Sequence, residues 1–391
     1  MSRKVAIIGT GMAKSGKSEV PSWLLFADAA LEAINEAGLE LTDIQGLHLG
    51  NTYSAYTESQ TNISPLVLSV MGIDNNIPCI RYEAACCSGS IAFRQGYLNI
   101  LSGMYDVMLV GGAERLRAVS GMKVQEAMAT CMDASERNTG LTFGAFWTYV
   151  AKAYARKHGL SLERLQELLA EITVKNHFHG SFNKKAHFQN LVTVEDVMQS
   201  PVVSPPIKLL DCCPFSDGAA ALVIASEEVA KRVKNPIWIQ GSGQASGSVQ
   251  IAEVSDLGSP NPGLIKAVQD AYKHAGMAPG DIDIAEVHDC VNIHEVLCLE
   301  GAGFYGPEET LHLAAEHKTY FDGEMPVNLS GGLKTRGHPV GATGAYQLCE
   351  ITRLLRGDFE GKRPAKPVNV GLTMNAGGTG SVYTAHILIK E

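Results

Sequence analysis

The sequence lacks the features that would place the protein in a membrane, on nucleic acid or outside the cell. No apolar run reaches the ~20 residues that a membrane-spanning helix needs. The first residues lead straight into an apolar strand, without the hydrophobic stretch of a signal peptide. Acidic residues outnumber Lys and Arg by 41 to 32, and the net charge of −9 comes with no basic stripe for nucleic acid. We therefore expect a cytoplasmic protein with no membrane and no nucleic-acid partner.

Disulfide and zinc-ribbon patterns are missing too, although the chain has nine cysteines. Their odd number and the missing signal peptide favour reduced thiols. No two of them have the Cys-x-x-Cys spacing of a structural zinc site. Free cysteines are usually small buried hydrophobic residues, so most of the nine should lie in the core. We predict no metal and no tightly bound cofactor.

What the chain does have is an alternation of strand and helix patterns. The N-terminal elements are predicted as strands at 4–9, 44–49, 79–83 and 106–110 and as helices at 23–37, 65–71 and 91–102. Gly38 ends the first helix as a C-cap. Strands that alternate with helices in this way favour a parallel sheet with helices on both faces.

The second half of the chain repeats the first. Residues 24–39 recur as 262–277, and Asp43 matches Asp281 at the same offset of 238 residues (281 − 43). A repeat of this size implies two similar α/β halves that pack together, with a functional site between them.

The segment 115–204 interrupts this pattern, because it is rich in Met, Lys and His and mostly helical. A strand predicted at 216–225 then returns to the first half, which makes the segment an insertion. We therefore assign three domains. They are an N-terminal half at 1–114 plus 205–230, an inserted helical loop domain at 115–204, and a C-terminal half at 231–391.

Six basic side chains lie close together near the end of this insertion. They are Lys175, His177, His179, Lys184, Lys185 and His187. One interpretation is a solvated helix end and loop. The other is a cradle for an anionic ligand, which an acidic protein must hold by a local cluster and not by its overall field.

The stretch 11–18 matches the pattern of a phosphate-binding loop directly after a strand. Such a loop needs a helix that starts at Gly16 and Lys17, whereas Pro21 would break a helix here. We therefore favour a plain polar loop over a nucleotide site.

A glycine-rich stretch at 331–344 holds His338 on a predicted tight turn, directly before a helix at 345–355. A histidine on a rigid turn suits proton transfer at neutral pH. An incidental histidine in a flexible loop is the alternative.

Cys86 and Cys87 lie in a small-residue elbow, 84–90, between a predicted strand and a helix. A helix N-terminus lowers the pKa of a thiol and offers N–H groups to a developing oxyanion, which suits a nucleophile. Two buried small residues are the alternative.

A further stretch, 286–294, follows a strand and contains His288, Cys290 and His294 around an aspartate. A histidine, an acid and a thiol at a strand end suit proton transfer. Zinc is the rival, but three ligands at this spacing lack a fourth. The final glycine-rich turn, 373–380, would let the backbone approach a reacting group.

Four stretches together resemble the thiolase superfamily. They are Cys86-Cys-Ser-Gly89, His288-Asp-Cys290, Gly337-His338-Pro-Val-Gly341 and the final glycine-rich turn. The His-Asp-Cys stretch and residues 209–218 are similar to the sterol-carrier-protein-type branch, which includes archaeal and many bacterial thiolases. The resemblance covers essentially the whole chain. It implies a five-layer αβαβα fold, acyl-CoA and CoA as substrates, and a homodimer or tetramer.

The resemblance also implies roles for individual residues. Cys86, three residues before the elbow glycine, matches the nucleophile, and His338 matches the base that activates it. Gly377 matches the residue whose N–H faces the acyl oxyanion.

One catalytic position departs from the commoner family pattern. Asn375 occupies the place where most thiolases have a second cysteine. In the sterol-carrier-like branch that thiol comes from the His-Asp-Cys stretch, so Cys290 inherits the acid/base role. His288 matches the residue that helps to hold the thioester oxygen. Val291 replaces the usual phenylalanine of the branch, which leaves the shape of the acyl pocket open.

The chemistry implied is CoA-dependent cleavage of a 3-oxoacyl-CoA, or the reverse Claisen condensation, through an acyl-Cys86 intermediate. One alternative is a retro-aldol lyase of the same branch, although those relatives need no cysteine nucleophile. Another is a non-catalytic subunit of a complex, which would be expected to lose a catalytic side chain. Some thiolases of this branch work with a small zinc-ribbon/OB-fold protein, and we expect such a partner here. We predict that CoA binds through the insertion, by Lys184 and Lys185.

Overall fold

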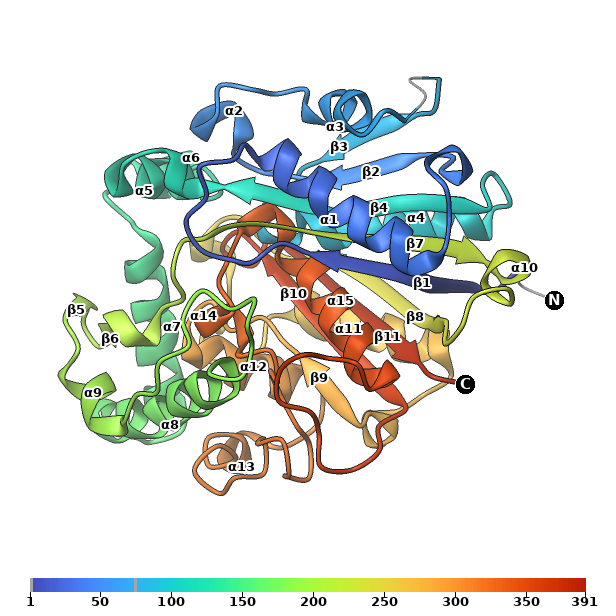
Figure 1. Cartoon of the computed structure of the whole chain (residues 1–391). Helices are drawn as coiled ribbons and strands as arrows, with labels where there is room; N and C mark the ends of the chain where they lie inside the picture. The colour runs from blue at the N-terminus through green and yellow to red at the C-terminus, as the bar shows by residue number, and fades with distance from the viewer. Residues whose placement is uncertain (1–2, 74–75) are drawn as a thin grey trace.

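The computed structural model describes residues 3–73 and 76–391 of the chain (Figure 1). Its main strands are β1 (Val5–Met12), β2 (Leu47–Gly50), β3 (Cys79–Tyr82), β4 (Val107–Arg115), β7 (Asp217–Ser226), β8 (Ile237–Ser246), β9 (Ile284–Glu286), β10 (Val370–Gly377) and β11 (Val382–Ile389). Within the described residues they form one sheet in the order β3-β2-β4-β7-β1-β8-β11-β10-β9.

The long helices are α1 (Ser22–Ala37), α3 (Ile63–Met71), α4 (Ser88–Leu101), α5 (Gly121–Ala129), α7 (Phe143–Lys157), α8 (Leu162–Gly180), α11 (Pro262–Ala275), α12 (Asn292–Gly301) and α15 (Thr343–Arg356). The short elements that matter below are α6 (Ala134–Arg137), α9 (Val194–Gln199), α10 (Glu227–Ala230), α14 (Gly332–Thr335), β5 (Val202–Ser204) and β6 (Ile207–Lys208). No helix among residues 3–73 and 76–391 is both long enough and apolar enough to cross a membrane.

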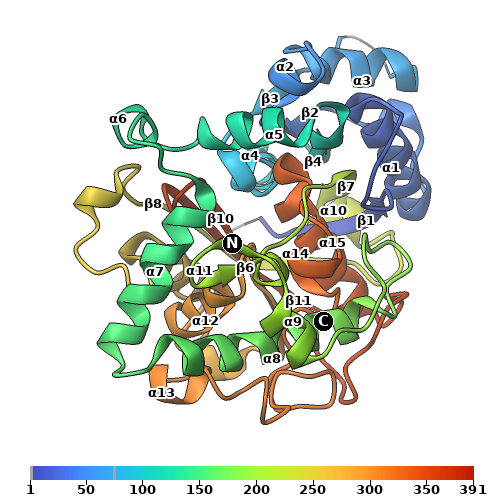
Figure 2. The same cartoon turned by 90° about the vertical axis from the view of Figure 1, so that its left-hand side faces the viewer.

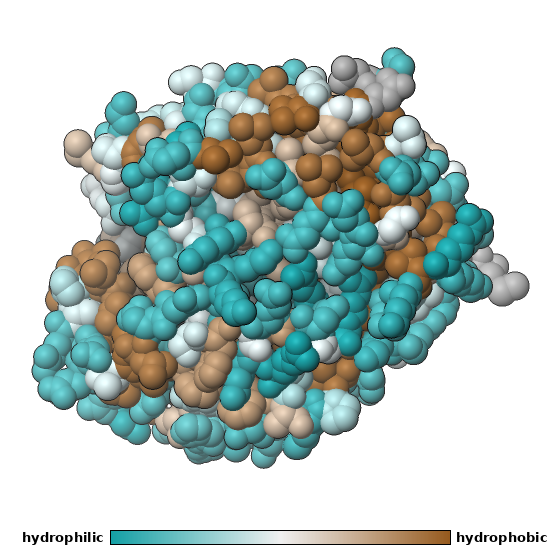
Figure 3. Space-filling model, viewed as in Figure 1, coloured by the Kyte–Doolittle hydropathy of each residue, from teal (hydrophilic) through white to brown (hydrophobic). Residues whose placement is uncertain are grey.

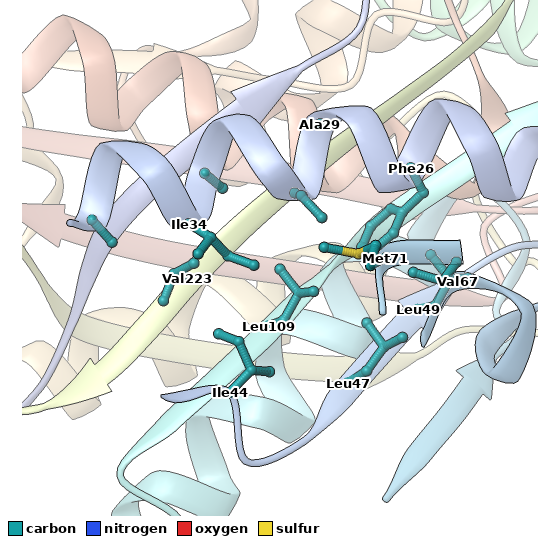
Figure 4. Close-up of a cluster of buried hydrophobic side chains, with 14 of the residues drawn as sticks. Phe26, Ala29, Ile34, Ile44, Leu47, Leu49, Val67, Met71, Leu109 and Val223 are labelled. Carbon is teal, nitrogen blue, oxygen red and sulfur yellow. The ribbon is translucent and has the colours of Figure 1, made fainter. Parts of the chain in front are cut away.

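The helices and the two halves of the sheet form five layers. Helices α1 and α3 cover the outer face of β2, β4 and β7, where Phe26 and Ile34 pack on Leu49 and Leu109 (Figure 4). Helices α4 and α15 fill the middle layer with an apolar cluster of their own, and α11 and α12 cover the strands of the C-terminal half. The predicted αβαβα fold from two similar halves is confirmed.

The repeat found in the sequence is also visible in the backbone. Gly38 and Gly276 end α1 and α11 with the same left-handed φ of +67°. The two half sheets meet at β1 and β8, the first strand of each half, where Ala6 pairs with Trp238 in an antiparallel contact.

The expectation of a parallel sheet is wrong for its central strands. Strand β2 pairs in parallel with β3 and β4, but β4 with β7, β7 with β1, and β10 with β11 are antiparallel. Strands β10 and β11 are joined by a short turn, which permits only an antiparallel pair. The long return from the insertion brings β7 back beside β4 in the opposite direction.

The elements from α5 to α9 gather at one end of the two half sheets (Figure 2). Phe146 and Trp147 of α7 and Leu168 of α8 share an apolar cluster with Val296 of α12, so this segment packs on the C-terminal half. Apolar side chains reach the surface over the β5–β6 hairpin (Figure 3). The domain limits assigned from the sequence remain a prediction.

The basic cluster was interpreted as a solvated helix end or as an anion cradle. Both interpretations are wrong for its first three members. Lys175, His177 and His179 are buried, because this turn of α8 faces the protein interior. The amine of Lys175 pairs there with the carboxylate of Glu295.

The polar loop at 11–18 is as expected. Gly16 forms an isolated bridge with Asp217, and Pro21 is the N-cap of α1, so no helix begins at Gly16 and Lys17. The geometry of a phosphate-binding loop is absent from this described stretch.

Candidate active site

Cys86 lies on a strained elbow between β3 and α4. The elbow is one 3₁₀ turn, η2 (Ala85–Cys87), whose first residue has a φ of +50°. The Ser88 hydroxyl holds the turn closed, since it accepts from the N–H of Ala84 at 2.9 Å and donates to the carbonyl of Ala85 at 2.7 Å. Left-handed non-glycine residues cost roughly 1–3 kcal/mol and gather at functional sites. Cys86 itself is buried.

His338 reaches this elbow from the C-terminal half. Gly337 turns the chain with a φ of +109°, and the N–H of His338 donates to the Ser216 hydroxyl at 3.1 Å. The Nε2 atom of His338 lies 3.2 Å from Sγ of Cys86. Two residues that are 252 positions apart are therefore in hydrogen-bond contact.

Thr343 decides which nitrogen of His338 carries the proton. Its Oγ1 lies 2.7 Å from Nδ1 of the ring. The same hydroxyl donates its one hydrogen to the carbonyl of Pro339 at 3.1 Å, so toward the ring it can only accept. Nδ1 of the neutral ring is therefore protonated, and the lone pair of Nε2 faces Cys86. This is the tautomer that can take a proton from the thiol.

Burial keeps both members of this pair uncharged. Burial, helped by the Arg336 guanidinium, lowers the pKa of His338 to about 3. Burial also raises the pKa of the Cys86 thiol well above its usual value, and the N–H of Gly378 opposes this. The expectation that the elbow favours a thiolate is therefore wrong for the resting site, because the loss of hydration outweighs the helix N-terminus.

His288 stands after β9 with its ring 5.4 Å from that of His338. Its Nδ1 atom lies 3.3 Å from Nδ2 of Asn375, which also donates to Oε1 of Gln347 at 2.9 Å. The amide nitrogen of Gln347 is in turn occupied by backbone carbonyls. An amide nitrogen can only donate, so Nδ1 of His288 accepts and its Nε2 carries the proton.

Cys290 lies at the N-terminal end of α12, and burial raises the pKa of its thiol well above the usual value. Asp289, beside it, ties this loop to the glycine-rich stretch at 331–344. Its carboxylate accepts from the N–H groups of Leu333 at 2.7 Å and Lys334 at 3.3 Å, at the start of α14. A helix N-terminus that is capped in this way fixes the relative position of both loops.

Gly377 lets the end of β10 touch the elbow. A Cβ atom at this position would lie 2.5 Å from the carbonyl oxygen of Ala84, so a larger residue would push the strand away. The structure thus brings the five predicted catalytic residues around one space: Cys86, His288, Cys290, His338 and Gly377.

A cleft leads from the surface to His288 and Cys290. Apolar side chains make up much of its wall: Phe146, Trp147, Val150, Leu257, Leu264 and Leu297. Val291 packs in the apolar cluster behind this wall and does not line the cleft.

Lys184 and Lys185 lie away from the described lining of this cleft. Lys184 is exposed, whereas the amine of Lys185 pairs with the carboxylate of Glu32 at 3.1 Å. Their contact with CoA remains a prediction.

Among residues 3–73 and 76–391, two groups of side chains have the atoms to hold a metal. One is Cys86, His288 and His338, and the other is His288, Cys290 and His294, with candidate atoms within 4.8 Å of one another in each. Each group has three members, whereas a structural zinc site has four ligands. We keep the prediction that the site works without a metal.

Sequence reasoning missed the role of Thr343. The available signal was its place five residues after His338, at the first position of the following helix. A hydroxyl there can reach back toward a side chain that precedes the helix.

Comparison with known proteins agrees with this geometry. The family model described as "Thiolase, N-terminal domain" matches residues 5–228, and "Thiolase C-terminal domain-like" matches residues 243–390. The chain is 37% identical to an acetyl-CoA acetyltransferase of Methanothermobacter thermautotrophicus, over 99% of this chain and 100% of the relative. It is 31% identical to the benzoylsuccinyl-CoA thiolase subunit BbsB of Thauera aromatica, over 97% and 96% of the two chains.

Similarity extends to longer proteins and to solved structures. Human sterol carrier protein 2 is 29% identical over 97% of this chain and 71% of its own length. A chain of the Ltp2-ChsH2(DUF35) aldolase superposes with a TM-score of 0.84 at 25% identity, over 99% of this chain and 98% of that one.

Proposed function

The chain belongs to the thiolase family, and we propose that it cleaves a 3-oxoacyl-CoA with CoA, or runs the reverse Claisen condensation. The observation that carries this proposal is the 3.2 Å contact between Sγ of Cys86 and the unprotonated Nε2 of His338. A thiol beside a base of fixed tautomer is a nucleophile that can be activated when substrate arrives. The names of the Methanothermobacter and Thauera relatives support an acyl-CoA substrate.

In the first half of the reaction, His338 takes the proton of Cys86 and the thiolate attacks the 3-oxo carbonyl. The N–H groups of Cys86 and Gly377 hold the oxyanion. The carbon–carbon bond then breaks, which leaves an acyl-Cys86 and the enolate of acetyl-CoA. Nε2–H of the charged His338 and Nε2–H of His288 both donate to the enolate oxygen, and Cys290 protonates its carbon.

In the second half, free CoA gives its thiol proton to Cys290 and attacks the acyl-Cys86. The tetrahedral oxyanion forms again and collapses to release the new acyl-CoA and the Cys86 thiolate. His338 returns its proton to this thiolate, which regenerates the neutral pair.

Replacement of each adjacent cysteine tests the assignment of the nucleophile. We expect Cys86→Ala to retain less than about a thousandth of the thiolysis rate, since removal of a nucleophile is among the most severe active-site changes. Cys87→Ala should retain most of the activity. It removes the neighbouring thiol, which faces the carbonyl of Val382. Mass spectrometry after incubation with an acyl-CoA should find the acyl group on Cys86. An adduct on Cys87 alone would overturn the assignment.

A retro-aldol lyase is the second candidate, because the aldolase chain shares the fold over nearly its whole length. A lyase of this kind would cleave a β-hydroxyacyl-CoA without free CoA and without a covalent adduct. The Cys86→Ala variant therefore separates the two functions, since a lyase would keep its activity.

Partners and location belong to the proposal as well. We propose a homodimer or tetramer in the cytoplasm, with acyl-CoA and CoA as substrates and a small zinc-ribbon/OB-fold protein as partner. The names of two similar proteins, the benzoylsuccinyl-CoA thiolase subunit BbsB and the Ltp2-ChsH2(DUF35) aldolase, support a multiprotein context for those proteins. Val202, Val203 and Leu209 expose 60%, 50% and 53% of their surface around the β5–β6 hairpin, which offers an apolar contact area. Light scattering with and without a co-expressed partner would measure the assembly.

A further inference from the structure

A second thiol–imidazole pair faces the cleft. Sγ of Cys290 lies 3.9 Å from Nδ1 of His294, within hydrogen-bond distance for sulfur. Both side chains line the cleft, so substrate that reaches one also comes near the other. The family resemblance gives Cys290 an acid/base role and leaves His294 without one.

Two aromatic neighbours hold the ring of His294 in this position. The indole of Trp147 lies 4.9 Å away at an angle of 46°, and the ring of His288 lies 5.5 Å away at 74°. Trp147 comes from α7, so the insertion contacts the catalytic centre through this ring. A ring that packs against two other rings keeps its nitrogen directed at one partner.

We propose that His294 is a positioning residue that hydrogen-bonds the sulfur of Cys290 and thereby sets how readily Cys290 exchanges a proton with the acetyl carbon. This inference rests on the proposed thiolase function. It adds to that function a residue that acts through Cys290 and leaves the Cys86–His338 pair untouched.

The step in question is a proton transfer from Cys290 to the enolate carbon. In cleavage, the S–H bond of Cys290 breaks, the proton moves to the enolate carbon, and the enolate electron pair forms the new C–H bond. The sulfur is left as a thiolate, which accepts the N–H of His294. The thiol of CoA then returns a proton to Cys290, so His294 begins and ends the cycle with the same number of protons.

The thiolate of Cys290 needs this support because its other neighbours supply little. The groups that face it are the thiols of Cys86, Cys213 and Cys298, the carboxyl of Asp289, and the rings of His288 and His294. The carboxyl of Asp289 disfavours a negative sulfur, and the thiols are only weak hydrogen-bond donors. The N-terminus of α12 helps, since Cys290 directly precedes the N-cap.

His294 acts as a neutral hydrogen-bonding group and not as an ion-pair partner. Burial lowers the pKa of its ring to about 4, so the ring is uncharged at neutral pH. In the tautomer that carries its hydrogen on Nδ1, the neutral ring donates this N–H to the sulfur of Cys290 throughout the cycle.

Two variants at this position separate a hydrogen bond from packing. His294→Phe keeps an aromatic ring beside Trp147 but removes both nitrogens. His294→Asn loses the ring but keeps an amide near the place of Nδ1. The readouts are the exchange of acetyl-CoA methyl protons in deuterated water, which reports on Cys290, and acyl labelling of Cys86, which reports on the other pair. All assays contain a chelator, so that trace metal cannot bind the histidine and cysteine side chains.

We expect His294→Phe to slow proton exchange about tenfold at pH 7.5 and to shift its pH profile upward by about one unit, because an unassisted thiol ionises less readily. His294→Asn should lie closer to the wild type. Labelling of Cys86 should stay within about twofold of wild type in both variants. Cys290→Ser should also take up the label but fail to exchange methyl protons.

Two results would overturn the inference. One is wild-type exchange in His294→Phe. The other is an equal loss of exchange and labelling, which would make His294 a general packing residue. If the wild-type protein itself neither acylates nor exchanges, the proposed thiolase function fails, and that outcome is distinct from both.

Discussion

The two halves of the fold build the same elbow and place different side chains on it. In the N-terminal half, η2 and α4 follow β3 and carry Cys86. In the C-terminal half, η7 (Val340–Ala342) and α15 carry Thr343, and His338 stands just before the turn. Neither half holds a complete pair of nucleophile and base. The proposed reaction therefore depends on the register in which the two elbows pack.

The packing of the two elbows is reciprocal. A Cβ on Gly89 would lie 2.8 Å from the carbonyl oxygen of Gly341, and a Cβ on Gly344 would lie 2.5 Å from the Cβ of Ser90. The first turns of α4 and α15 thus touch backbone to backbone. The backbone of the site is therefore symmetric, although its side-chain chemistry is not.

The largest effect should come from breaking this reciprocal contact. Gly344→Ala and Gly89→Ala each place a Cβ within 3 Å of the opposite elbow, and backbone there cannot move without displacing Cys86 or His338. We expect about 2–3 kcal/mol of destabilisation from each, together with loss of most activity. Thermal or urea unfolding with a thiolysis assay measures both.

Gly121→Ala is the control for these two variants, because a Cβ at that position meets no atom within 4 Å. It should change stability by less than about 0.5 kcal/mol. Equal stability of Gly344→Ala and Gly121→Ala would show that the elbows are not close-packed.

The next largest effect should come from Thr343, the hydroxyl residue of the second elbow that contacts His338. Thr343→Val keeps the shape of the side chain but removes the hydroxyl that contacts Nδ1 of His338. We expect kcat to fall about 100-fold, because the ring can then take the tautomer that has no lone pair toward Cys86. Thr343→Ser restores the hydroxyl and should recover most of the rate. If valine and serine behaved alike, the tautomer would not depend on position 343.

Local sequence signals predicted much of the fold. Gly38 and Gly276 end their helices as expected, because a C-cap depends only on neighbouring residues. The internal repeat predicted that the chain has two similar halves and that these halves pack together. Strand direction was predicted less well, since the pairing of β4 with β7 is decided by the long return from Arg115 to Asp217 and not by a local pattern.

The candidate site, like the fold, was predictable from the sequence only in part. Motif spacing predicted which side chains meet, and the contact between Cys86 and His338 agrees with it. The charge states were not predictable, because burial of a thiol or a ring depends on the packing of distant segments. Lys175 shows the same limit. A lysine in a basic run suggests a surface residue, yet Lys175 pairs with Glu295, which lies 120 positions away.

A smaller effect should show whether Cys86 and His338 rest as a neutral pair or as an ion pair. It is the pH dependence of the alkylation rate of Cys86. The raised pKa of Cys86 and the lowered pKa of His338 mean that the thiolate fraction grows with pH up to the raised value. Alkylation of Cys86 by iodoacetamide should therefore accelerate about tenfold per unit between pH 7 and 9. Peptide mass spectrometry follows this cysteine alone. A rate that is flat over this range would indicate a thiolate–imidazolium pair at rest.

The smallest expected effect concerns two lysines of the insertion that do not line the cleft. Lys184 is exposed and Lys185 is occupied by Glu32, so Lys184→Glu is the cleaner test of a contact with the phosphates of CoA. We expect KM for CoA to rise about twofold at low ionic strength with kcat unchanged, and the difference to vanish in high salt, because exposed charges are screened. Lys231 follows α10 at the other end of the molecule (Figure 1) and pairs with Glu227 at 2.7 Å, and Lys231→Glu is the control for charge reversal as such, which should leave KM unchanged. If both variants leave KM unchanged at low salt, the phosphates bind elsewhere, either along the cleft beside α7 or on the partner protein.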